Sequence, residues 1–245
     1  MAGGRKSRAA ALGLLGVFWA GSAFAQDTGC FSFGYGIDDL EAGGFILGRV
    51  NALSPRVNFV KRDVLQKGCP ASTAACRDKA YLVPEDEVVI IGGQDEFVCA
   101  VYADRKGHVT DGWLPRAALT VVQEKPSFPP EEWLGTWKSG PEQEIRIAWG
   151  SKTSMKIKGD ATWGASDPGR VARGAVNIGE IEGEASPEGN TLSFGIGEDG
   201  ALPFHEADDV DCKVQMKRLG AYLLVKDNNM CGGANVTFTG VYRRQ

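Results

Sequence analysis

The C-terminal half of the chain is built from short stretches in which apolar and polar residues alternate, separated by glycine, proline and other turn residues. These stretches cover residues 144–147, 154–158, 176–181, 191–194, 213–217, 221–225 and 236–242. Alternation with a period of two places one face of a strand in a core and the other in water. Helix signals are scarce, with a turn at 38–42 and a short helix at 71–79 as the candidates. We therefore predict an all-β fold whose C-terminal part is an antiparallel up-and-down β-barrel of about eight strands.

Proline divides the chain into two modules. Residues 124–132 contain three prolines, and proline fixes φ and lacks a backbone donor, so this segment is predicted to be an extended linker. The linker separates a small β module at 63–123 from the barrel at 133–245. Residues 26–62 are poorly patterned and are predicted to form an N-terminal arm.

The first 25 residues have the pattern of a Sec-type signal peptide. A basic start is followed by an apolar run at 9–20 and by Ala23-Phe24-Ala25, a small-residue cleavage signal. A retained membrane anchor is the alternative, but the run is shorter than the roughly 20 residues that span a bilayer. We expect cleavage after Ala25 and a periplasmic or secreted protein.

The composition limits the partners of the mature chain. Cleavage removes three of the 27 basic residues and leaves 24 against 31 acidic ones, a net charge of −7. Nucleic acid and anionic membranes require a basic face, so neither is expected as a partner. No later segment is long and apolar enough for stable membrane insertion, and no cofactor motif is present.

Six cysteines form an even set, which in an exported chain indicates disulfides. The linker separates four of them from the other two, so pairing within each module gives Cys212–Cys231. Among the remaining four we favour the compact loop Cys69–Cys76, which leaves Cys30–Cys99, while the other connectivities stay open. A metal site is the rival, but the chain has no Cys-x-x-Cys and only two histidines.

Two motifs resemble known families. Gly-Trp-Leu-Pro at 112–115 followed by residues 116–119 resembles the bacterial SH3-like family, in which a strand ending in this way leads into one tight helical turn. Residues 86–91 and 97–102 match the core strands that precede it. In this chain Ala118 replaces the usual aromatic residue and Glu96-Phe97 the tandem tryptophan, so the resemblance implies the fold but not proline-peptide recognition. Trp113 is a candidate contact residue, with a core position in a small barrel as the alternative.

The second motif, Gly135-Thr136-Trp137, resembles the first strand of lipocalin-like (calycin-type) barrels. That resemblance implies that Arg243 or Arg244 lies over Trp137 and closes one end of the barrel, a cation–π contact. The order of motifs as a whole also resembles exported proteobacterial proteins of uncharacterised function. None of these resemblances implies an activity.

The barrel offers two further candidate binding sites. Trp163 lies in a Gly/Pro-rich loop at 161–170 with Arg170 and Arg173 close by, and Trp and Arg are enriched at interface hot spots. The alternative is that Trp163 folds back as a lid over the barrel end. The second site is the barrel interior, which Phe194, Met216 and Tyr222 are predicted to line. The alternative is that side chains simply fill it. The residues of both sites are candidates for binding, not for catalysis.

Catalytic motifs are missing from the sequence. His108 and His205 lie in turn-rich loops, and no nucleophile elbow, phosphate loop or His-Glu-x-x-His is present. The acidic loop at 206–211, near 198–200 in sequence, is a weak candidate for calcium because it lacks the alternating ligands of a known motif. We therefore predict that the chain is not an enzyme and holds no metal.

The combined prediction is an exported, non-enzymatic binding or adaptor protein of the cell envelope, whose partner is an envelope protein or peptidoglycan. One alternative is a proteinaceous inhibitor of a wall-degrading, lysozyme-type hydrolase, because an acidic surface suits a basic target. Another is a small-ligand carrier that uses the barrel interior.

Overall fold

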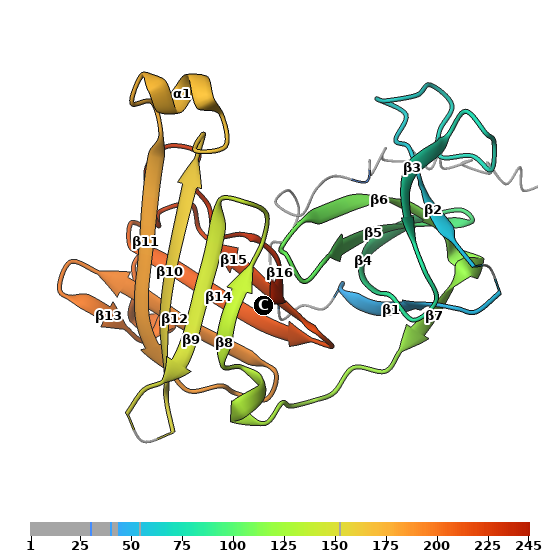
Figure 1. Cartoon of the computed structure of the whole chain (residues 1–245). Coiled ribbons are helices and arrows are strands. Elements are labelled where there is room, and N and C mark those ends of the chain that lie inside the picture. The colour runs from blue at the N-terminus through green and yellow to red at the C-terminus, as the bar shows by residue number, and fades with distance from the viewer. Residues whose placement is uncertain (1–29, 31–39, 41–43, 54, 152) are drawn as a thin grey trace, which may run out of the picture.

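The computed structural model describes residues 30, 40, 44–53, 55–151 and 153–245, and its fold is all-β with two antiparallel sheets (Figure 1). The predicted signal peptide and most of the predicted turn at 38–42 lie outside the described residues. In the described part of the chain, no helix is long and apolar enough to cross a membrane.

The first sheet, which we call the N-terminal module, has seven strands in the order β3-β2-β6-β5-β4-β1-β7. They are β1 (Ile46–Val50), β2 (Val57–Val60), β3 (Arg77–Leu82), β4 (Glu87–Gln94), β5 (Phe97–Ala103), β6 (Val109–Pro115) and β7 (Leu119–Val122). A 3₁₀ turn, η1 (Arg116–Ala118), joins the last two. 

Two predictions for this region need correction. Strands β1 and β2 belong to the range predicted to be an arm, and they pair inside the sheet. Gly48 interrupts the apolar–polar alternation of β1. A side chain at this position would displace Ile90, because an added Cβ would lie 2.9 Å from Cδ1 of Ile90. The predicted helix at 71–79 is absent: turns and bends occupy its first part and β3 its end. The disulfide that closes residues 69–76 into a short loop leaves no room for helical turns there.

The second sheet is a nearly closed barrel of nine strands in the order β11-β10-β9-β8-β16-β15-β14-β12-β13. They are β8 (Gly135–Lys138), β9 (Gln143–Trp149), β10 (Met155–Trp163), β11 (Asn177–Ala185), β12 (Thr191–Gly197), β13 (Gly200–Leu202), β14 (Cys212–Leu219), β15 (Tyr222–Asp227) and β16 (Gly240–Arg244). The first and last strands pair, so only the seam between β11 and the β12–β13 hairpin is open. The alternating stretches include neither β8, which the Gly135-Thr136-Trp137 motif indicated, nor the short β13, which was not predicted.

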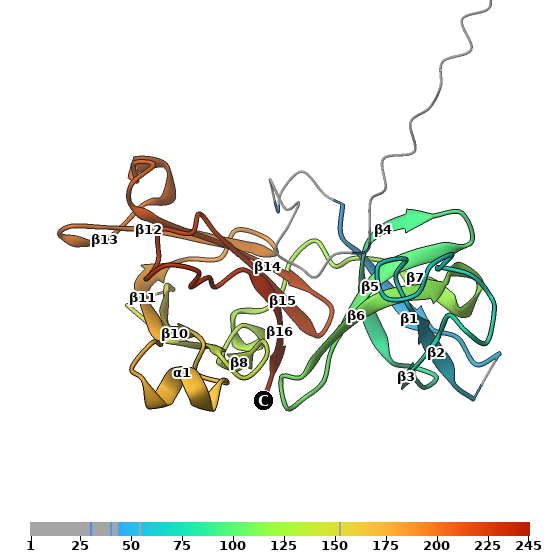
Figure 2. The same cartoon turned by 90° about the horizontal axis from the view of Figure 1, so that it is seen from above.

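Helical elements are few in the described chain. They are α1 (Pro168–Ala172), η2 (Pro130–Glu132) and η3 (Phe204–Glu206), besides η1. Figures 1 and 2 place α1 at one end of the barrel, at the tip of the β10–β11 hairpin, and show the β12–β13 hairpin projecting from its side.

The barrel interior is filled with side chains. Its buried cluster includes Trp137, Phe194, Met216, Phe238 and Tyr242. Phe194 and Met216 therefore lie in the interior, as predicted, but they help to occupy it. At the open seam the Phe194 ring lies directly against the main chain of β11.

Tyr222 does not line the interior. Its neighbours along β15, Leu223 and Val225, belong to the interior cluster, whereas Tyr222 and Leu224 belong to a second buried cluster outside the barrel. The opposite orientation of successive side chains on a strand explains the difference. The prediction for Tyr222 is corrected for this reason.

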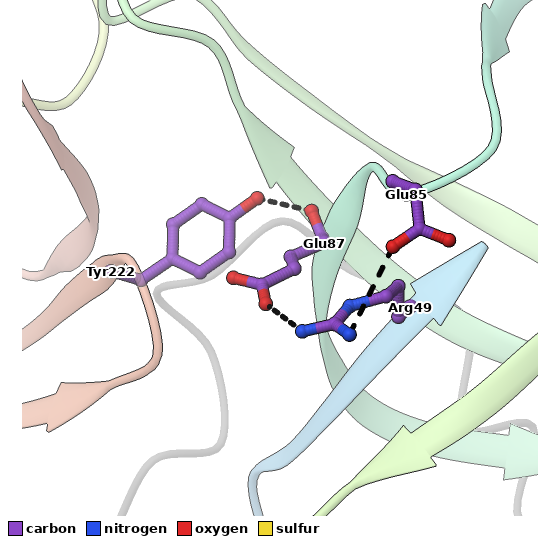
Figure 3. Close-up of polar contacts among 4 residues, drawn as sticks. All are labelled: Arg49, Glu85, Glu87 and Tyr222. Carbon is purple, nitrogen blue, oxygen red and sulfur yellow. Dashed lines mark hydrogen bonds and ion pairs between the residues drawn. The ribbon is translucent and has the colours of Figure 1, made fainter.

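The second buried cluster joins the two modules. From the barrel it takes Leu219, Tyr222, Leu224 and Val241; from the N-terminal side it takes Leu40, Leu47, Val89, Val101 and Ala103. The Tyr222 hydroxyl donates to the main-chain oxygen of Glu87, whose carboxylate accepts a hydrogen bond of 2.9 Å from Arg49 (Figure 3). Arg49 also lies 3.9 Å from Glu85. The modules thus share a continuous apolar core with a polar edge.

The predicted linker, residues 124–132, lies against the barrel. Phe128 is buried in the interior cluster of the barrel, and the Glu124 carboxylate lies 3.1 Å from the buried Lys217 ammonium. The prolines keep the segment out of the sheets as predicted, but it acts as a strap across one barrel end rather than as a free tether.

Three disulfides are present, and they are the three that we favoured: Cys30–Cys99, Cys69–Cys76 and Cys212–Cys231. The described cysteines include no free thiol. This full pairing indicates an oxidising compartment outside the cytoplasm.

Candidate functional site

Trp163 and Arg170 meet at the tip of the barrel. The Asp167 side chain caps α1 by accepting from the amides of Gly169 and Arg170, a typical N-cap. This places the Arg170 guanidinium 3.7 Å from the centre of the Trp163 ring, and Arg170 Nε donates to the Ala175 oxygen at 3.1 Å.

The surroundings of Trp163 favour the lid over the contact site. Its indole packs against the barrel core and under the Arg170 guanidinium, so the side chain is half-buried rather than freely exposed. Arg173 does not join the pair, because it donates to the Gly169 oxygen. The sequence placed Arg170 near Trp163 correctly, but it could not show that this arginine covers the ring.

The opposite end of the barrel is closed by an arginine that sequence analysis missed. The Arg218 guanidinium lies 4.7 Å from the Trp137 ring centre and 4.6 Å from that of Phe128. Arg244 is 6.0 Å from Trp137, and Arg243 instead lies over Tyr222 at 5.0 Å. The predicted stacking role therefore belongs mainly to Arg218.

Arg218 also ties the strap to the barrel. It is only 4% exposed and donates to the main-chain oxygens of Glu132, Gly220 and Tyr222. Burial lowers the pKa of its guanidinium to about 10. The sequence did carry a signal for this buried cation: Arg218 lies in a strand with apolar residues, two residues before the turn residue Gly220. Gly135, the other structural candidate, packs its main chain against the side chain of Arg244.

Trp113 lies in the core of the N-terminal module. It is 2% exposed and belongs to a cluster that contains Cys30–Cys99 and Cys69–Cys76. The core alternative is therefore the better description, since no face of this ring is available to a partner.

A groove of about 590 Å³ opens on the N-terminal module beside this core. It runs between the β1–β2 loop, the 71–77 loop and the turn after β6. Its lining residues are Asn51, Leu53, Arg56, Val57, Asn58, Val60, Ala71, Ser72, Thr73, Arg77, Phe97, Pro115, Ala117 and Ala118. Phe97, Val57 and Val60 are buried and form an apolar floor, while Pro115 and Ala118 are half-buried.

The charges of the groove are all of one sign. Arg56 and Arg77 line it, and no acidic residue among those that the structure describes does. Arg56 stacks on Tyr81 at 4.5 Å from the ring centre. Neither arginine forms an ion pair with a carboxylate of the described chain.

Two other clefts have balanced charges. A cleft of about 530 Å³ between the modules contains Glu144, which binds Lys138 and Arg146. Although partial burial acts in the opposite direction, these two cations hold the pKa of Glu144 below its usual value. A larger cleft of about 760 Å³ contains Lys156 and Lys158, which hold the Glu182 carboxylate from both sides. 

The two histidines remain isolated. His108 Nδ1 lies 3.0 Å from Asp104 Oδ2 at the rim of the inter-module cleft, and the imidazole is largely exposed. His205 lies 3.8 Å from the exposed Glu206. Across the described residues, no three His, Cys, Asp or Glu side chains converge closely enough to hold a metal ion, and this includes the acidic loop at 206–211.

Comparison with protein-family models, with curated proteins and with solved structures finds no match to this chain.

Proposed function

We propose that this chain is an exported, non-enzymatic binding or adaptor protein of the cell envelope. Its N-terminal module serves as an SH3-like docking unit, and a lipocalin-like barrel serves as its scaffold. The observation that carries the proposal is the groove on the N-terminal module, which combines a buried apolar floor with polar and cationic walls. Binding sites for peptides and small molecules commonly have this composition.

Two features of the barrel make the alternatives weaker or more specific. The interior is occupied by Phe194, Met216 and their neighbours, which leaves a small-ligand carrier with little support. The inhibitor alternative is favoured by the projecting β12–β13 hairpin and the segment after it (Figure 2). Its acidic residues are Glu198, Asp199, Glu206, Asp208, Asp209 and Asp211. Failure of the chain to slow any lysozyme-type hydrolase at equimolar concentration would exclude the inhibitor.

A pull-down from an envelope extract tests the docking proposal. Ala118→Trp places a large ring in the groove, and Val121→Trp adds the same ring on the exposed surface of β7, outside it. We expect the mature wild-type chain to capture a partner that Ala118→Trp loses and that Val121→Trp retains. Trp163→Ala should also retain it.

A parallel assay with purified peptidoglycan separates the two kinds of partner. Co-sedimentation that Ala118→Trp abolishes would make the wall the ligand of the groove. No capture by the wild-type chain in either assay would refute the binding function, and equal capture by both tryptophan variants would move the binding site away from the groove.

A further inference from the structure

We infer that the groove on the N-terminal module binds an acidic peptide segment of a partner protein, with carboxylates of the segment held by Arg56 and Arg77. The inference rests on the proposed function and adds the chemical class of the ligand.

The charge of the groove is complementary to that of an acidic ligand. The mature chain is acidic, yet the described lining of the groove contains two guanidiniums and no carboxylate. A guanidinium presents five N–H donors in a planar fork that matches a carboxylate. Stacking on Tyr81 engages the face of the Arg56 guanidinium and leaves its N–H edge for a ligand.

The contrast with the barrel surface strengthens this argument. There, neighbouring cations share a carboxylate: Lys156 and Lys158 share Glu182, so their charges are already compensated. In the groove no carboxylate of the described chain forms an ion pair with Arg56 or Arg77. An anionic partner would complete these pairs without first breaking an existing one.

The floor of the groove is apolar, and small side chains form part of its wall. The buried side chains of Phe97, Val57 and Val60 line the same groove as the two cations, and a simple inorganic anion would make no use of this apolar floor. The small side chains of Ala118 and Pro115 project little into the groove. An extended peptide with small or apolar side chains between its carboxylates can therefore lie along this wall. Two cations are too few for a nucleic acid, whose binding requires a broad basic face.

The test uses a fluorescein-labelled synthetic peptide in which Asp and Glu alternate with Ala and Val. A matched peptide carries Asn and Gln at the acidic positions. Fluorescence anisotropy with the full mature chain measures both affinities at low and at high salt. We expect the acidic peptide to bind more tightly and its affinity to fall with added salt, because exposed ion pairs are screened.

Variants locate the effect. The double substitution Arg56→Gln and Arg77→Gln should weaken binding of the acidic peptide roughly tenfold, since each exposed pair accounts for a few-fold change. Lys79→Gln removes an exposed cation of β3 that does not line the groove, and it should leave the affinity unchanged. Circular dichroism and Tm show whether each variant is folded.

Equal binding of the acidic and amide peptides would overturn the inference, and so would equal losses in Lys79→Gln and the double variant. If the wild-type chain captures an envelope partner while the acidic peptide does not bind, the ligand class is wrong and the docking function stands. If neither binds, the docking function itself has failed.

Discussion

The contact between Gly183 and Phe194 closes the open seam of the barrel and can be tested directly. An added Cβ on Gly183 would lie 2.3 Å from Cδ2 and 2.5 Å from Cε2 of the Phe194 ring. Phe194 is fully buried among the other interior side chains, so the ring cannot move without disturbing them. We expect Gly183→Ala to lower the free energy of unfolding by about 1–3 kcal/mol, the usual cost of overpacking a core.

Urea unfolding followed by circular dichroism and tryptophan fluorescence measures this change. Phe194→Leu should also destabilise the barrel, but it makes room for the new methyl group. The double variant should therefore lose less than the sum of the single losses, with a coupling of at least about 0.5 kcal/mol. Gly92→Ala is the control, because an added Cβ there meets nothing within 4 Å; its effect should stay within about 0.5 kcal/mol.

A Gly183→Ala chain as stable as the wild type would refute the argument. The ring would then have space to retreat into, and the barrel interior could not be as tightly filled as the buried cluster indicates. That result would favour the alternative function, a carrier that binds a small ligand in the barrel interior.

Three further predictions concern the disulfides, the module interface and acid sensitivity. Removing Cys30–Cys99, which joins residues 69 apart in sequence, should lower the free energy of unfolding by about 4 kcal/mol. Removing Cys69–Cys76, whose cysteines are 7 apart, should lower it by only about 2 kcal/mol. Urea unfolding of variants with each pair changed to alanine measures both losses. Tyr222→Phe leaves a main-chain oxygen of the N-terminal module without its donor and should cost about 1–2 kcal/mol in the same assay, with both modules still unfolding in one transition. Hydrogen bonds from Ser151 and Ser154 lower the pKa of Glu184 to about 2. The contribution of the Glu184 carboxylate to stability is therefore present above about pH 4.5 and lost as the pH falls towards 2. Glu184→Gln should therefore flatten the loss of Tm over that range, and an unchanged acid profile would contradict the assignment.

Alternation in the sequence predicted the barrel because most of its strands have one face in the core and one in water. In β10 the exposure alternates from Met155 to Ala161, and the polar residues Lys156, Lys158 and Asp160 all face outward. The disulfides were predictable for a different reason: the linker left only two cysteines in the C-terminal part, and the sequence loop at 69–76 is short.

Strand β15 was predicted, but the roles of its faces were not. The N-terminal module covers its outer face, so Tyr222 and Leu224 are as buried as Leu223 and Val225. A strand buried on both faces has no alternation from which to read an inside and an outside. Only the packing of a segment more than a hundred residues away in sequence, around Glu87, decides which face meets the barrel core.

The groove had no signal in the sequence because its walls come from segments far apart along the chain. Arg56 lies in a loop of the predicted arm and Arg77 in a predicted helix, and the sheet order brings both beside Phe97. For Trp163 the sequence left two interpretations open, an exposed contact and a lid over the barrel end. The surroundings favour the lid, because α1 places Arg170 over the ring.

The strand β5 connects the groove to the module interface. Phe97, at its start, lines the groove, whereas Val101 and Ala103, near its end, pack in the cluster shared with the barrel. Binding in the groove therefore leaves the barrel contact intact, and the barrel tip at α1 and the β12–β13 hairpin remain free on the other side of the molecule (Figures 1 and 2). Because the shared apolar cluster and the strap hold the modules together, a partner bound in the groove, as we propose, would lie at a fixed distance from one bound to the barrel. A flexible linker could not impose that geometry, which would suit the adaptor function that we propose.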